Sequence, residues 1–193
     1  LILSSSIFAN KYVEEIPKKF ESKIGSFLKA KNVIAVNSGT SAIYLALKSL
    51  NLNKTDEIIT TPRTFLATSS SAMLLKSKPI FADVSEDSGC ITPETIEPLI
   101  TKKTKAISVV HLAGWPAEIE EICKLAKSYK LHVIEDCAQA HGARYNGQVV
   151  GSIGHIGAFS FCQDKIMTTG GEGGMIVTND ESLWKRAWEF KDH

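Results

Sequence analysis

Lys165 lies between an apolar segment, residues 159–161, and a run of Thr and Gly residues that extends to Gly174. An amine at the exit of a strand, beside backbone that carries no side chains, can form a Schiff base with the carbonyl group of a cofactor. Most lysines of a globular protein are instead solvated surface charges. The interpretation of Lys165 as a reactive amine therefore depends on the residues that accompany it elsewhere in the chain.

A second segment, residues 37–42, has the composition of an anion site. Gly39 lets the backbone approach a ligand closely, Thr40 and Ser41 offer hydroxyl groups, and the start of the following helix offers unpaired N–H groups. The hydroxyl group of Ser160, near the end of a later strand, could reach the same phosphate. An ordinary N-capping turn uses the same residue types, so both interpretations stay open at this point.

Asp136 follows directly after an apolar strand, residues 132–135. A carboxylate in that position needs a cationic or hydrogen-bonding partner. The protonated ring nitrogen of pyridoxal would serve, and so would a structural arginine or a helix cap. Phe65 begins a helix after another strand exit, where an aromatic ring either lies flat on a cofactor ring or belongs to the core.

These residues follow strands that alternate with helices along the whole chain, a pattern typical of βαβ units and of a mostly parallel sheet covered on both faces. We therefore expect an α/β fold, a three-layer α/β/α sandwich around a mostly parallel seven-stranded sheet, with ligands at the strand exits. The segment 142–157 is rich in Gly and predicts a loop. Strands are expected at 32–36, 57–60, 79–82, 106–110, 132–135, 158–161 and 174–178, with helices at 41–50, 65–75, 93–100, 118–129 and from 181 onward.

The composition is that of an ordinary globular protein, with 193 residues of which 44% are hydrophobic and 22% are charged. The formal net charge of +1 gives no overall field that favours nucleic acid or an anionic membrane. No apolar run approaches the roughly 20 residues that span a bilayer. Neither a nucleic-acid partner nor a membrane partner is therefore expected.

The four cysteines, Cys90, Cys123, Cys137 and Cys162, have no C-x-x-C spacing, and the histidines have no H-E-x-x-H spacing. Free thiols in a reducing cytoplasm are expected, and no metal site is expected. The chain begins without Met and stops directly after its last helix. We expect residues 1–193 to be the large-domain part of a longer protein.

Four motifs, taken in order, give the chain a family resemblance. They are residues 37–42, 64–68, 135–142 and the stretch from Phe159 through Lys165 to Gly174. From about Phe20 onward the chain closely resembles the sugar aminotransferases of the DegT/DnrJ/EryC1/StrS family, which have fold type I and depend on pyridoxal 5'-phosphate. Such enzymes usually take an amino group from glutamate and pass it to a nucleotide-linked keto-sugar.

The resemblance implies a role for each candidate residue. Lys165 matches the Schiff-base lysine, and Asp136 matches the carboxylate that pairs with the pyridine nitrogen. The residues that match the other cofactor contacts are Gly39, Thr40 and Ser160 at the phosphate, Phe65 on the ring face and Gln139 near the ring hydroxyl group, and Ser41 is expected as a further cofactor-binding residue. The resemblance also implies a symmetric homodimer with shared sites and a C-terminal small domain that this chain lacks. Trp184 and Trp188, on one face of the last helix, fit a contact with that domain or with a second subunit.

Two departures from the family pattern stand near the lysine. The stretch after it, residues 168–174, has one more Gly than the commonest form, and Cys162-Gln163-Asp164 replaces the usual residues before it. Three alternatives remain: a sugar dehydratase of the same fold, which has His at the Schiff-base position; another reaction on the same cofactor, such as desulfuration or decarboxylation; and a non-catalytic regulator or binding module. Lys165 argues against the first, and the lack of a cysteine on an evident flexible loop argues against desulfuration. Retention of both Lys165 and Asp136 argues against the third.

Overall fold

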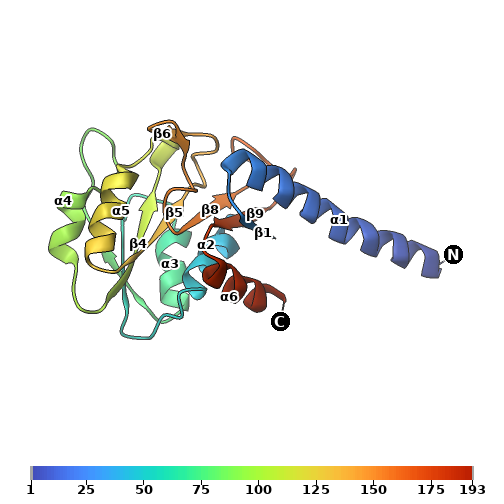
Figure 1. Cartoon of the computed structure of the whole chain (residues 1–193), viewed down its shortest axis with the longest axis horizontal. Coiled ribbons are helices and arrows are strands. Elements are labelled where there is room, and N and C mark those ends of the chain that lie inside the picture. The colour runs from blue at the N-terminus through green and yellow to red at the C-terminus, as the bar shows by residue number, and fades with distance from the viewer. Residues whose placement is uncertain (1, 193) are drawn as a thin grey trace.

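A seven-stranded sheet forms the centre of the structure, a computed structural model that describes the backbone of residues 2–192 and the side chains of residues 15–192 (Figure 1). This confirms the expected fold class. From one edge to the other, the strands are β1 (Asn32–Val36), β9 (Gly174–Thr178), β8 (Ile156–Ser160), β5 (His132–Asp136), β4 (Thr104–Val110), β2 (Glu57–Thr60) and β3 (Lys78–Phe81).

The sheet is mostly parallel, because only β9 runs against its neighbours, β1 and β8. The register aligns the ends of the central strands: Val110 of β4 pairs with Asp136 of β5, and Asp136 pairs with Ala158 of β8. The carboxyl ends of β4, β5 and β8 therefore lie at one edge of the sheet, where ligands of open α/β sheets collect.

Helices cover both faces of the sheet and bury two apolar cores against it. One core includes Ile134 and Ile176, and the other, on the opposite face, includes Val109 and Val133. The first face carries α2 (Gly39–Lys48), α3 (Ala67–Leu74) and α6 (Glu181–Asp192), and the second carries α4 (Pro93–Ile96), η1 (Glu97–Leu99) and α5 (Ile119–Ser128). The short helix η2 (Leu112–Gly114) follows β4.

The tryptophans of α6 are part of the first core rather than a free surface. Trp184 and Trp188 are partly buried against it, and their ring centroids lie 6.0 Å apart. Their apolar face is therefore explained by packing within this chain. None of the helices among the described residues is both long enough and apolar enough to cross a membrane.

Two features differ from the elements expected from the sequence. The helix α1 (Ile2–Leu28) has no counterpart among those elements, because Pro17 interrupts its pattern. Its last turns lie beside the sheet (Figure 1). Ile24 and Leu28 of these turns are buried. The expected loop 142–157 contains a hairpin, β6 (Arg144–Tyr145) and β7 (Gln148–Val149). Asn146 and Gly147, both with positive φ, form its turn, and this dipeptide is a strong hairpin signal.

The alternation of strand side chains decides which residues face α2 and α3. Ile134 and Ile176 belong to the core beneath these helices, so Asp136 and Gly174, two residues along each strand, face the same way. Gly174 lies so close to the chain before α2 that a Cβ atom there would overlap the Ser38 carbonyl group. A glycine in β9 therefore lets the start of α2 sit directly on the sheet.

We expect Gly174→Ala to lower the free energy of unfolding by at least about 2 kcal/mol, because its methyl group meets backbone atoms that cannot rotate away. Gly171→Ala is the matched control, since no atom lies within 4 Å of its Cβ position. It should change stability by less than about 0.5 kcal/mol. Urea unfolding of both variants measures the difference, and equal stability would contradict the close approach.

Candidate active site

A cavity of about 320 Å³ opens at the carboxyl edge of the sheet. Segments far apart in the sequence meet there: the start of α2, the turn before α3, the end of β5 and the loop after β8. All the predicted site residues except Ser41 line it, namely Gly39, Thr40, Phe65, Asp136, Gln139, Ser160 and Lys165. The fold thus brings together residues that the sequence singled out separately.

One wall of the cavity is the N-terminus of α2, which packs against the end of β8. A Cβ atom on Gly39 would stand 2.5 Å from the Cβ atom of Ser160, so only glycine allows this contact. The side chain of Ser38 caps the helix by accepting a hydrogen bond from the Ser41 N–H at 3.1 Å. Free N–H groups, the helix dipole and the Ser160 hydroxyl group together make a site that fits an anion.

Ser41 is the predicted residue that lies outside this wall. Its Oγ donates to Asn37 Oδ1 at 2.6 Å and lies 3.0 Å from Ser38 Oγ. The hydroxyl group is therefore engaged within the capping turn, which is the ordinary role that the sequence left open for this segment.

Asp136, at the end of β5, is buried with 4% of its surface exposed. Its Oδ2 accepts a hydrogen bond from Thr68 Oγ1 at 2.8 Å, and its Oδ1 accepts one from the Ala138 N–H at 3.1 Å. Burial raises the pKa of Asp136, while the Thr68 hydroxyl group, the Ala138 N–H and the charges of His111 and Lys165 act in the opposite direction.

Thr68 is a residue of the site that the sequence analysis did not single out, although it closes the matched motif 64–68. Its Oγ1 lies 2.9 Å from Thr64 Oγ1, and both residues line the cavity. The sequence signal for Thr68 was its position at a helix start, four residues after Thr64. No neighbouring residue in the sequence indicates that Thr68 has a carboxylate partner.

Lys165 stands in the loop that leaves β8, where its N–H donates to the Cys162 carbonyl group at 3.1 Å. Its Nζ lies 3.9 Å from Asp164 Oδ1, and 22% of its side chain is exposed. Phe65 stands at the rim of the cavity with 70% of its surface exposed, so its ring is available to a ligand. Gln139 Oε1 accepts a hydrogen bond from the Ala113 N–H at 2.8 Å.

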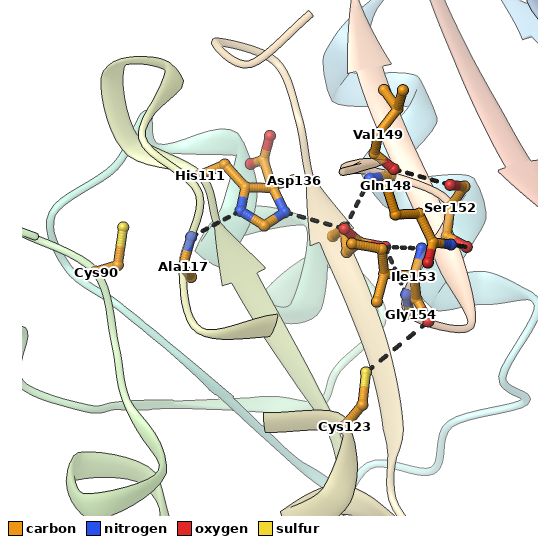
Figure 2. A network of polar contacts seen from close by, with 12 residues as sticks. Cys90, His111, Ala117, Cys123, Asp136, Gln148, Val149, Ser152, Ile153 and Gly154 are labelled. Atoms are coloured by element: carbon orange, nitrogen blue, oxygen red, sulfur yellow. Dashed lines mark hydrogen bonds and ion pairs between the residues drawn. The ribbon is translucent and has the colours of Figure 1, made fainter. Parts of the chain in front are cut away.

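The opposite face of the sheet carries a second buried carboxylate, Glu135. It contacts His111 Nε2 at 3.1 Å and accepts hydrogen bonds from the N–H groups of Gly151, Ile153 and Gly154. The other ring nitrogen of His111 accepts from the Ala117 N–H, so the histidine lies between two partners (Figure 2).

Cys137 joins His111 and Glu135 in a group whose ligand atoms lie within 4.8 Å of one another. The two nitrogens of His111 and the carboxylate of Glu135 are already hydrogen-bonded, and burial raises the pKa of the Cys137 thiol well above its usual value. The group therefore acts as a structural anchor, and its chemistry does not favour a metal ion. All four cysteines of the chain are free.

The cavity combines an amine, a buried carboxylate, an anion-binding helix start and an exposed aromatic ring. These groups fit an aromatic aldehyde that carries a phosphate group and a basic ring nitrogen. The close contact between Gly39 and Ser160 forms a place for the phosphate group. Asp136 accepts a hydrogen bond from Thr68 and has room for a further donor, so it suits the ring nitrogen. The donor set therefore fits pyridoxal phosphate.

The comparisons with known proteins agree with this geometry. The model of the DegT/DnrJ/EryC1/StrS aminotransferase family matches residues 5–193. GDP-perosamine synthase of Escherichia coli O157:H7 is 43% identical over 174 residues, which are 90% of this chain and 48% of that protein. The chain spans about half the length of the curated relatives it matches.

Solved structures are similar over nearly the whole chain. The X-ray structure of an aminotransferase from Psychrobacter cryohalolentis has a TM-score of 0.93 and 51% identity, and the match covers 98% of this chain and 49% of that one. The structure of NtdA from Bacillus subtilis with bound cofactor PMP has a TM-score of 0.85 and 34% identity, over 96% of this chain and 44% of that one.

Asp136→Asn should stabilise the protein without cofactor at pH 7–8. Because burial raises the folded-state pKa of Asp136, its contribution to stability is present below the unfolded pKa and is lost as pH rises through the folded pKa. An amide avoids this loss, so we expect a Tm higher by about 2 °C or more, the shift that about 1 kcal/mol causes in such a domain. The advantage should shrink below about pH 4.

The control is Asp164→Asn, because hydrogen bonding from Cys162 and the charge of Lys165 lower the pKa of this exposed carboxyl. It should give no gain in Tm at neutral pH. A Tm for Asp136→Asn below that of the wild type at pH 7 would show that the lost carboxylate hydrogen bonds outweigh relief from burial.

Proposed function

Because the chain belongs to the DegT/DnrJ/EryC1/StrS aminotransferase family, whose cofactor is pyridoxal phosphate, we propose that the protein is a sugar aminotransferase. The proposed reaction moves an amino group from glutamate to a nucleotide-linked keto-sugar, as a step in the synthesis of amino sugars for surface polysaccharides. The name of one relative, GDP-perosamine synthase, supports a nucleotide-linked sugar as the substrate class.

The observation that carries the proposal is the meeting of Lys165, Asp136 and the N-terminus of α2 around one cavity. A binding module would need an anion site alone. The amine and the buried carboxylate add the two groups that a pyridine aldehyde requires for transamination. A dehydratase of this fold would lack the amine, so Lys165 favours amino transfer.

The phosphate end of the cofactor is assigned to the start of α2. In the proposal, the backbone N–H groups at Gly39 and Thr40 and the hydroxyl group of Ser160 donate to the phosphate oxygens. The helix dipole adds attraction for the negative charge. These groups hold the cofactor so that its ring lies between the rim and the end of β5.

The ring is assigned to the opposite part of the cavity. Phe65 covers one ring face, Gln139 contacts the ring hydroxyl group, and the carboxylate of Asp136 holds a proton on the ring nitrogen. When bound, the protonated ring supplies an electron sink for the carbon that loses its proton. The Nζ of Lys165 would bind the cofactor, and as a free amine it would take the proton that the substrate carbon loses and hold it on Nζ.

The remaining half of the site is proposed to come from outside this chain. Of the described residues that line the cavity, Lys165 is the one with a cationic side chain, whereas a phosphate group usually needs several strong donors. We assign the missing contacts to a second subunit of a symmetric homodimer. A small domain beyond residue 193 would complete the chain, in line with the greater length of the relatives.

The surface around α3 is the proposed contact between subunits. Phe65 and Leu66 before the helix and Met73 and Leu74 within it are all exposed large apolar side chains, beside the exposed Phe81 of β3. Clusters of this kind are typical of interaction sites rather than of solvated surfaces. One of them, Phe65, lines the cavity, where a partner must reach the phosphate.

The function is tested by incubating the protein with pyridoxal phosphate, glutamate and a panel of nucleotide-linked keto-sugars, with amino-sugar products identified by mass and NMR. Borohydride reduction and peptide mapping should find a pyridoxyl label on Lys165. Lys165→Ala should give neither product nor label, because no other amine replaces it. Lys185→Ala, at an exposed position of α6, should behave as the wild type. A label on another lysine, or no product with any sugar, would overturn the assignment.

The assembly is tested by sedimentation. The wild type should sediment as a dimer, and Leu74→Glu should shift it toward monomer and weaken cofactor binding, because a charge would be buried in the contact. Ser128→Glu, on exposed α5 at the opposite face of the sheet, adds the same charge and should remain dimeric. Equal sedimentation of the two variants would exclude α3 as the interface.

A further inference from the structure

Three side chains that line the cavity, those of Thr64, Thr68 and Asp136, form a short hydrogen-bonded chain. Thr68 Oγ1 donates to Asp136 Oδ2 at 2.8 Å, and Thr64 Oγ1 lies 2.9 Å from Thr68 Oγ1. A hydroxyl group has a single proton, and Thr68 gives its proton to the carboxylate. Thr64 must therefore donate to Thr68, which fixes the direction of the chain from Thr64 through Thr68 to Asp136.

The surroundings of Asp136 make this chain important for its charge. The carboxylate is buried, and Glu135 and Cys137 flank it along the chain. The facing groups on other elements are His111 after β4, whose N–H donates to the Asp136 carbonyl group, and Lys165. His111 accepts a backbone hydrogen bond at one ring nitrogen and contacts Glu135 with the other, so neither ring nitrogen is directed at the Asp136 carboxylate.

Among the described residues, each Asp136 carboxylate oxygen accepts one hydrogen bond, Oδ2 from Thr68 and Oδ1 from the Ala138 N–H. A carboxylate oxygen has room for a further hydrogen bond. The Ala138 N–H comes from the same strand end, whereas the Thr68 hydroxyl group comes from α3. Thr68 is thus the contact that holds the carboxylate relative to the turn that carries Phe65.

We propose that Thr68 is a positioning residue, which holds the Asp136 carboxylate as a fixed acceptor for the ring nitrogen of the cofactor, with Thr64 supporting it. The inference rests on the proposed function. A purely structural hydrogen bond that ties α3 to the sheet would affect stability and the titration of Asp136, but not the affinity for the cofactor. A positioning role must also change cofactor affinity and the pH dependence of that affinity.

The first experiment needs no cofactor. The protein is labelled with ¹³C at the aspartate carboxyl groups, and the Asp136 signal, identified by its absence in Asp136→Asn, is titrated by NMR. Removal of a hydrogen bond to the charged form raises the pKa of a carboxyl group. The titration of Asp136 should therefore move to higher pH in Thr68→Val and, by a smaller amount, in Thr64→Val.

The second experiment measures the dissociation constant of pyridoxal phosphate from pH 5 to pH 8 by absorbance. At pH 7 we expect about tenfold weaker binding in Thr68→Val, the scale of one hydrogen bond to a charged group. The acid side of the affinity profile should also move to higher pH. Thr68→Ser keeps the hydroxyl group and should stay within about twofold of the wild type at every pH.

Ser69→Ala is the matched control, because the Ser69 hydroxyl group donates to the carbonyl group of Leu66, the residue before α3, and not to Asp136. It should leave both profiles unchanged. Unshifted profiles in Thr68→Val, or an equal loss in Thr68→Ser, would overturn the proposal. If Thr68→Val does not fold, the Thr64→Val profiles decide in the same way. A wild type that binds no cofactor would refute the proposed function, while the NMR titration would still test Thr68.

Discussion

Two adjacent carboxylates at the end of β5, Glu135 and Asp136, impose the main constraint on this structure. Strand geometry sends them to opposite faces of the sheet, and both are buried, so each needs its own set of donors. Glu135 collects His111 and the loop 151–154, and Asp136 collects Thr68 and the Ala138 N–H. The carboxyl edge of the sheet is organised around these two charges.

The two carboxylates accept different numbers of hydrogen bonds, and this difference distinguishes the structural residue, Glu135, from the candidate site residue, Asp136. Glu135 receives four hydrogen bonds and lies away from the cavity. Asp136 receives two and faces the cavity. A buried carboxylate with spare acceptor capacity costs stability, and proteins retain such groups mainly at functional sites. The incomplete satisfaction of Asp136 is therefore an argument for a ligand in its own right.

The sequence pointed to residues with distinctive chemical groups more readily than to the residues and elements that hold them in place. Lys165 and Asp136, which line one cavity, were singled out because an amine and a carboxylate at strand exits are unusual. Thr68 was missed because its partner lies 68 positions away and a Thr at a helix start has an ordinary local explanation. The hairpin at Asn146 and Gly147 was missed although its signal was local, and α1 was missed because Pro17 interrupts its pattern.

The helix α3 contributes both to the candidate active site and to the proposed contact between subunits. Its inner face holds Asp136 through Thr68, while its outer face exposes Met73 and Leu74 to solvent. In the proposed dimer, a partner that covers the outer face would also limit the motion of the helix that fixes the carboxylate. Subunit contact and the position of Asp136 would then depend on one short element. An isolated large domain would keep all its chemical groups and yet bind the cofactor ring less firmly.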